Sequence, residues 1–177
     1  MQVLKARETS REFGPETKIP LQVLSNLLWA ADGASRADGK RTAPSAVNWQ
    51  NIDIYVAMAD GLYLYDAPQH ALKLLLTEDV RAATGQQPFV KAVPLNLVHV
   101  ADFARAKTAK GVNPNAEVWS AAGAGFISQN VYLYCASEGL ATVVRGLFDQ
   151  AALGKVLNLR PDQKIMLTQS VGYPRKK

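Results

Sequence analysis

The chain has 177 residues, of which 48% are hydrophobic and 20% are charged. This composition is that of a folded globular protein and excludes a disordered or collagen-like chain. The length suits one domain over residues 1–177. No apolar run approaches the ~20 residues that a bilayer-spanning helix needs, so we expect no membrane partner.

The net charge of +5 is modest, and its cations gather partly at Lys5–Arg11 and Arg175–Lys177 rather than on one long basic face. We therefore do not expect a nucleic-acid partner, although a basic stripe assembled by folding stays an open alternative. Residues 1–5 lack the apolar stretch of a secretory signal, which favours a cytoplasmic protein. A leader removed before this segment also stays open.

The side chains that most often carry enzyme chemistry are scarce. Cys135 is the single cysteine, which excludes an internal disulfide, and its apolar surroundings predict a small buried hydrophobe. His70 and His99 lie far apart in or beside predicted strands, so we expect structural or exposed roles for them. No metal-binding cluster, phosphate-binding glycine loop or nucleophile elbow occurs. An enzyme with so few polar candidates needs a cofactor for the difficult step.

The first half of the chain predicts one helix followed by strands. A helix begins after Pro20 and ends before Gly33, because Leu21, Leu24, Leu28 and Ala31 recur at helical spacing. Residues 32–47 form a loop. Three strands are expected next, over Ile52–Met58, Leu62–Tyr65 and Ala71–Leu75, with a turn at Asp60-Gly61 joining the first two.

The second half predicts two strands and two helices. A central strand covers Val93–Val100, and the longest helix runs over Ala116–Glu138 until Gly139 ends it. That helix has few polar faces, so we expect it to be buried, in part by a partner subunit. Asp149 caps a second helix, and Ile165–Val171 closes the chain as a strand. The irregular order of helices and strands indicates an α+β fold.

A cluster near the N-terminus has the chemistry of a phosphate site. Arg7 and Arg11 flank Thr9 and Ser10. Guanidinium groups give forked, charge-assisted hydrogen bonds to phosphate oxygens, and hydroxyls add short neutral donors. A solvated helix end with Arg and Glu pairs is the alternative interpretation.

Four segments in chain order together resemble the FMN-dependent nitroreductase family. The first, Arg7-x-Thr9-x-Arg11-x-Phe13, resembles the R-x-S-x-R-x-F opening that grips the FMN phosphate and ribityl chain. It implies cofactor contacts from Arg7, Thr9, Ser10 and Arg11.

The second segment, residues 41–51, resembles the P-S-x-x-N loop of the family, which comes from the other subunit and covers the isoalloxazine ring. It implies contacts from five consecutive residues, namely Pro44, Ser45, Ala46, Val47 and Asn48. The residues that follow, Ile52–Asp66, are similar to the branch of the family that oxidises azoline rings.

The third segment, residues 138–148, resembles the G-L-G-T-x-x-x-G-G-F stretch whose backbone amides face flavin N5 and O4. It implies contacts from Val143, Val144, Arg145 and Gly146. The fourth, residues 170–177, resembles the terminal V-G-Y-P strand, after which basic residues return to the phosphate. It implies contacts from Arg175 and Lys176.

The resemblance implies a central, mostly antiparallel sheet flanked by helices, in one FMN-binding domain that forms an intertwined homodimer with FMN at the interface. The implied function is an FMN-dependent oxidoreductase that passes hydride equivalents from NADH or NADPH to nitroaromatics or quinones by a ping-pong mechanism. Because the flavin carries the chemistry, we expect no catalytic side chain and no metal.

Several positions depart from the family pattern. Glu8 stands where a basic or polar residue is common. Arg145 replaces a smaller or acidic residue, and its side chain could hold an anionic substrate, stabilise negative charge on the flavin, or point to solvent. The span between Val100 and Trp119 is short, which predicts a reduced helical lid. Two other functions stay open, an FMN-dependent dehydrogenase acting on azoline rings and a non-catalytic flavin-binding module.

Overall fold

The computed structural model describes residues 1–15, 17–109 and 111–175, and within them no helix is both long and apolar enough to cross a bilayer. The α-helices are α1 (Gln2–Ala6), α2 (Leu21–Asp32), α3 (Ala116–Glu138) and α4 (Gln150–Val156). The strands are β1 (Ile52–Met58), β2 (Gly61–Asp66), β3 (Ala71–Leu76), β4 (Leu95–Asp102), β5 (Lys107–Thr108), β6 (Gly111–Val112), β7 (Ala141–Arg145) and β8 (Gln163–Gly172). Short 3-10 turns are η1 (Ala46–Asn48), η2 (Arg81–Thr84) and η3 (Pro88–Lys91).

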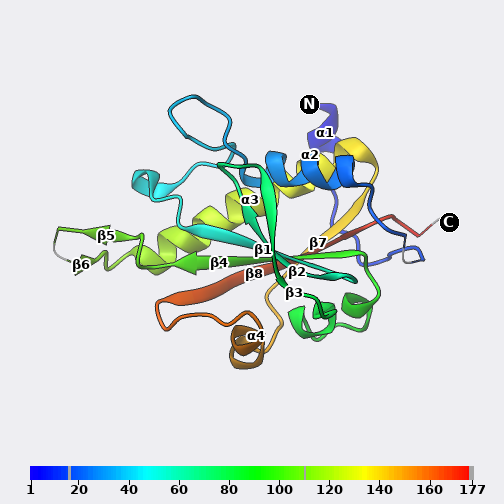
Figure 1. Cartoon of the computed structure of the whole chain (residues 1–177). Helices are drawn as coiled ribbons and strands as arrows, with labels where there is room; N and C mark the ends of the chain where they lie inside the picture. The colour runs from blue at the N-terminus through cyan, green and yellow to red at the C-terminus, as the bar shows by residue number, and fades with distance from the viewer. Residues whose placement is uncertain (16, 110, 176–177) are drawn as a thin grey trace.

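Six strands form one sheet in the order β3-β2-β1-β4-β8-β7, and neighbouring strands pair antiparallel. Helices α2 and α3 cover one face of the sheet, and α4 lies on the other (Figure 1). The predicted α+β architecture with an antiparallel sheet between helices is therefore confirmed.

The sheet is held by a core on each face. Every residue of the central strand β4 is buried, and successive side chains point to opposite faces. Leu95 and Leu97 pack with α2 and α3, while Val98 and Val100 pack with Leu153 of α4. The two cores fix β8 and β7 beside β4, and β7 becomes one edge of the sheet.

Several element boundaries differ from the sequence prediction for local reasons. β4 begins at Leu95 rather than Val93, because Pro94 has no N–H to donate and the Val93 N–H closes the η3 turn onto Phe89. β8 is longer than predicted and begins at Gln163. The predicted cap at Asp149 is confirmed, since its carboxylate accepts from the N–H groups of Ala151 and Ala152.

Three features were not predicted as elements. β7 lies inside the segment that was interpreted only as a cofactor motif, α1 precedes the phosphate cluster, and β5 and β6 form a small hairpin. The described residues between Val100 and Trp119 hold this hairpin and no α-helix before α3 begins, which agrees with a reduced lid.

His99 at the centre of β4 generates a prediction about acid stability. Its side chain is fully buried, and burial lowers the pKa of the imidazole to about 4. An unfolded chain has an ordinary histidine pKa near 6.5, so between the two values the unfolded state binds more protons and stability falls as the pH falls. We expect the titration of His99 to lower the free energy of unfolding by about 2 kcal/mol between neutral pH and pH 5.

Urea denaturation of the wild type and of His99→Gln at pH 7 and pH 5 measures this contribution, because the difference between the two proteins isolates the titrating group. The wild type should lose more stability on acidification than the variant. Parallel losses in the two proteins would show that His99 is not buried in its neutral form.

Candidate functional site

The N-terminal segment, residues 7–14, lies along the outer edge of β7. The Ser10 N–H donates to the Thr142 carbonyl at 3.0 Å, which satisfies one open group of this edge strand. The Tyr132 hydroxyl of α3 accepts from the Val144 N–H at 3.0 Å and hydrogen-bonds the Thr9 hydroxyl at 3.0 Å. The predicted phosphate cluster and the segment expected to face the flavin are thus brought together.

The C-terminal segment joins the same place. Phe13 and Pro174 form an antiparallel bridge, and the Gly14 N–H donates to the Tyr173 carbonyl at 2.9 Å. One step further, the Arg175 N–H donates to the Glu12 carbonyl at 3.2 Å. The two ends of the chain therefore run side by side next to β7.

Three guanidinium groups accompany these segments. Arg7 is half-buried, Arg11 and Arg175 are exposed, and none of the three pairs with a carboxylate among the residues that the structure describes. Arg7 lies over the Tyr132 ring, 5.4 Å from its centroid. Lys176, which was assigned to the same group, lies outside the described residues. The chain ends carry cations that are available to an anion.

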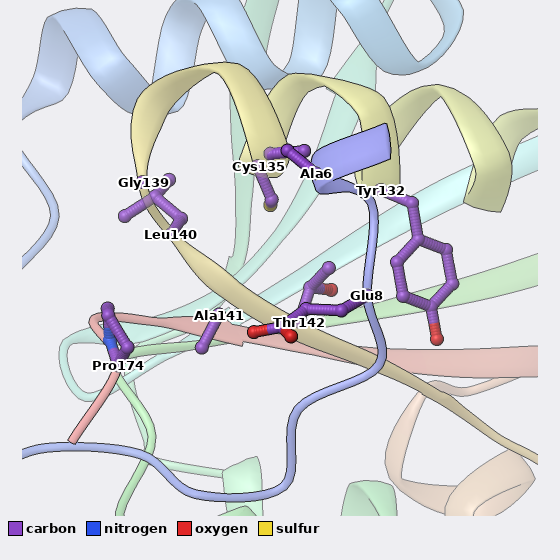
Figure 2. Close-up of a pocket in the computed structure, with 10 residues that line it drawn as sticks. Ala6, Glu8, Tyr132, Cys135, Gly139, Leu140, Ala141, Thr142 and Pro174 are labelled. Carbon is purple, nitrogen blue, oxygen red and sulfur yellow. The ribbon is translucent and has the colours of Figure 1, made fainter. Parts of the chain in front are cut away.

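A cavity of about 190 Å³ opens beside this junction, between the end of α3, β7 and the chain ends (Figure 2). Glu8, Tyr132, Cys135, Thr142 and Pro174 are among its lining residues. Burial raises the pKa of the Cys135 thiol to about 12, so the sulfur stays protonated and is no nucleophile. The sequence expectation of an inert buried cysteine agrees with this geometry.

The residues assigned to flavin N5 and O4 differ in exposure. The Val143 side chain is fully buried, Val144 is half-buried on the side of Tyr132, and Gly146 is exposed where β7 ends. At its outer edge this strand presents backbone groups rather than side chains.

Arg145 requires a correction. Its side chain points neither to solvent nor to the α3 face of the sheet, because it contacts Asn96, which alternates along β4 with Leu95 and Leu97 of the α2 and α3 core. The Arg145 guanidinium is buried on the opposite face, where it donates to the Thr84 carbonyl at 2.9 Å and to Asn96 Oδ1 at 3.0 Å. Gly85 has no room for a Cβ beside this guanidinium.

Burial lowers the pKa of Arg145 to about 10, so the side chain is still charged at neutral pH. Its hydrogen bonds tie the end of β7 to the η2 turn and to β4. A structural role therefore replaces the suggested contact of this side chain with substrate.

The loop of residues 44–48 lies elsewhere in the chain. Trp49, directly after it, stacks on Trp119 at the start of α3 with 5.3 Å between ring centroids. Tyr132 is thirteen residues further along the same helix, or about 20 Å at 1.5 Å per residue. Within one chain, this loop and the cation cluster formed by Arg7, Arg11 and Arg175 lie at opposite ends of α3 (Figure 1).

This loop is exposed at its tip and fixed at its base. Val47 and Asn48 adopt left-handed backbone conformations with φ of 49° and 56°, and Val47 is 75% exposed. For a β-branched residue that conformation is strained, and such strain concentrates at functional segments. At the base, Arg41 contacts the buried Asp32 at 2.5 Å.

The outer face of α3 is apolar although it faces away from the sheet. Val118 and Phe126 are 68% and 48% exposed, and Ala122 lies between them on the same side of the helix. Exposed apolar patches of this kind are typical of protein interfaces.

Comparison with known proteins places this arrangement in a family. The sequence profile of the Nitroreductase family matches residues 4–173, which is nearly the whole described chain. The chain belongs to the nitroreductase family. It is therefore an oxidoreductase, of a family whose members are flavoproteins that use NAD(P)H.

Two relatives share substantial sequence with this nitroreductase-family chain. It is 30% identical over 168 residues to MJ1384 of Methanocaldococcus jannaschii, which carries a provisional nitroreductase name, and the match covers 89% of this chain and 83% of that protein. It is 42% identical to a provisionally named nitroreductase from Ralstonia eutropha, whose crystal structure superposes with a TM-score of 0.92 over all of this chain and 83% of that chain.

A more distant likeness shows the fold alone. A chain of the Escherichia coli microcin synthetase McbBCD complex, solved with truncated pro-MccB17 bound, has a TM-score of 0.83 at 17% identity. The match covers 96% of this chain and 69% of that one. At this identity the likeness does not decide between the substrate classes of the family.

Sequence reasoning missed Tyr132 and Thr142, which bind the N-terminal segment to β7 and α3. Their only sequence signal was indirect. Tyr132 belongs to a helix assigned to the core, and Thr142 lies within a motif interpreted through its later residues.

The buried position of Arg145 predicts a large effect on stability. Arg145→Ala leaves the Thr84 carbonyl without its donor and opens a gap in the core, so we expect a loss of about 2–3 kcal/mol of unfolding free energy. Arg11→Ala removes an exposed guanidinium and should change stability by less than about 0.5 kcal/mol. If chemical denaturation gave equally small stability losses for the two variants, the Arg145 side chain would not be buried.

Proposed function

We propose that the chain is an FMN-dependent oxidoreductase that transfers hydride equivalents from NADH or NADPH to small organic acceptors such as nitroaromatics or quinones. The observation that carries the proposal is that the segments carrying Arg7, Arg11 and Arg175 meet beside β7, at the junction of the two chain ends.

The donor set fits the phosphate of FMN. A phosphate monoester is a dianion near neutral pH, and arginine forks bind its oxygens with charge-assisted hydrogen bonds. Thr9 and Ser10 add hydroxyls on the same segment. Glu8 places an opposing charge at the cavity, which weakens the attraction without removing the net positive charge of the cluster.

The end of β7 fits the polar edge of a flavin ring. The strand is an edge strand, so alternate backbone groups point away from the sheet. Gly146 is exposed where the strand ends, and Arg145 fixes that end from the opposite face. Backbone donors held this rigidly are suited to stabilising negative charge on a ring.

When bound, FMN supplies the two-electron chemistry, and the protein supplies binding and orientation. The cations hold the phosphate, the β7 end orients the ring, and no side-chain acid or base is required. NADH or NADPH and the acceptor would occupy the same open ring face in turn.

We further propose that the site is completed in a homodimer. In one chain the loop of residues 44–48 lies next to Trp119 and the cation cluster next to Tyr132, about 20 Å further along α3, so the loop would close over the ring of a second copy. The exposed apolar face of α3 supplies a self-complementary surface for a two-fold interface.

The first test measures cofactor retention. Arg11→Ala should weaken FMN binding about tenfold, because one charged hydrogen-bond donor to the phosphate is lost. Glu8→Gln removes the opposing charge on the same segment and should strengthen binding. Fluorescence titration of the apoprotein with FMN checks both variants. Unchanged affinity in Arg11→Ala would contradict the assigned phosphate site.

The second test asks whether each site draws on two chains. Arg11→Ala impairs the phosphate cluster, and Asn48→Asp impairs the loop. After the two variants are unfolded and refolded together in equal amounts, half of the dimers are mixed, and each mixed dimer has one intact site. We expect activity to return to about a quarter of the wild-type level. No recovery would indicate that the loop and the cluster of one chain serve the same site.

The third test separates the candidate activities. A yellow purified protein should lose its visible absorbance on anaerobic addition of NADH or NADPH and regain it on addition of a nitroaromatic. Reduction only by an azoline peptide would favour the dehydrogenase alternative. Tightly bound flavin that no donor reduces would favour a non-catalytic module.

A further inference from the structure

Tyr132 lies where three segments of the proposed site meet. Its hydroxyl hydrogen-bonds the Thr9 hydroxyl at 3.0 Å and accepts from the Val144 N–H at 3.0 Å, while its ring lies under the Arg7 guanidinium at 5.4 Å. One side chain thus contacts two of the expected phosphate ligands and the expected ring-facing strand.

The position of this tyrosine differs from that of a core residue. Its side chain is half-buried and lines the 190 Å³ cavity, and Figure 2 shows the ring beside the N-terminal chain that carries Glu8. The next tyrosine on the helix, Tyr134, faces elsewhere and donates to the Val23 carbonyl of α2 at 3.2 Å. Tyr134 serves the packing of two helices, whereas Tyr132 serves the junction of the chain ends.

The contact with Tyr132 restricts the rotation of the Thr9 hydroxyl. A hydroxyl on an exposed segment is free to rotate, and fixing it costs conformational entropy at the moment of binding. The Tyr132 hydroxyl fixes the Thr9 side chain in advance, and the ring restricts Arg7 by a cation–π contact. Both effects act on groups that would bind phosphate.

We propose that Tyr132 is a positioning residue that makes the site selective for a phosphorylated flavin. This inference rests on the proposed function, and it assigns the selectivity for FMN over riboflavin to a side chain of α3. The Tyr132 hydroxyl acts on the phosphate ligands through Thr9, whereas Val144, its other partner, is also held by pairing with β8. Removing the hydroxyl therefore weakens the phosphate contacts more than the ring contacts.

Tyr132→Phe is the sharpest variant, because it removes both hydrogen bonds and keeps an aromatic ring under Arg7. Tyr134→Phe is the matched control, since it removes one hydroxyl hydrogen bond from the same helix at a site away from the chain ends. The apoproteins are titrated with FMN and with riboflavin, which lacks the phosphate, and their melting temperatures are recorded.

In Tyr132→Phe we expect the dissociation constant of FMN to rise about tenfold and that of riboflavin to stay within about twofold of wild type. Tyr134→Phe should leave the ratio of the two affinities unchanged even where the melting temperature falls. Equal losses for both flavins in Tyr132→Phe, or no loss for either, would overturn the inference. A wild-type protein that binds riboflavin and FMN equally would also overturn it, and one that binds neither would overturn the proposed function itself.

Discussion

The structure depends on how one open strand edge is covered. β7 is the last strand of the sheet, and its outward backbone groups need partners. The N-terminal segment supplies one through Ser10, and Tyr132 of α3 supplies another. Because the C-terminal segment pairs with Glu12, Phe13 and Gly14 of the same N-terminal segment, covering this edge also brings both chain ends, with their basic residues, to one place.

The opposite face of β7 explains why this edge is rigid. The buried Arg145 guanidinium donates to the Thr84 carbonyl of the η2 turn and to Asn96 Oδ1 of β4. Buried guanidinium groups are costly when they lack partners, so these contacts fix the strand end in one position. The loop of residues 44–48 differs, because its tip is exposed and strained. These features support the proposal that a second copy supplies the other half of the site.

Much of the fold was predictable from the sequence because its signals are local. The turn at Asp60-Gly61, the spacing of leucines in α2 and the cap at Asp149 each depend on neighbouring residues, and all three are confirmed. β7 was not predicted as a strand because its boundaries are set by pairing with β8, far along the chain. The side chain of Arg145 was misplaced for a related reason, since the face that it occupies follows from the alternation of a strand that had not been recognised. Tyr132 had no local signal at all, because its partners come from two distant segments.

The central claim is that the two chain ends bind the phosphate of a flavin at the edge of β7, while a second copy covers the ring. A crystal structure of the protein grown with FMN tests it most directly. We expect the phosphate to lie within hydrogen-bonding distance of Arg7 or Arg11, and residues 44–48 of the partner subunit to lie over the ring. A flavin bound away from β7, or a ring covered by the loop of the same chain, would contradict it.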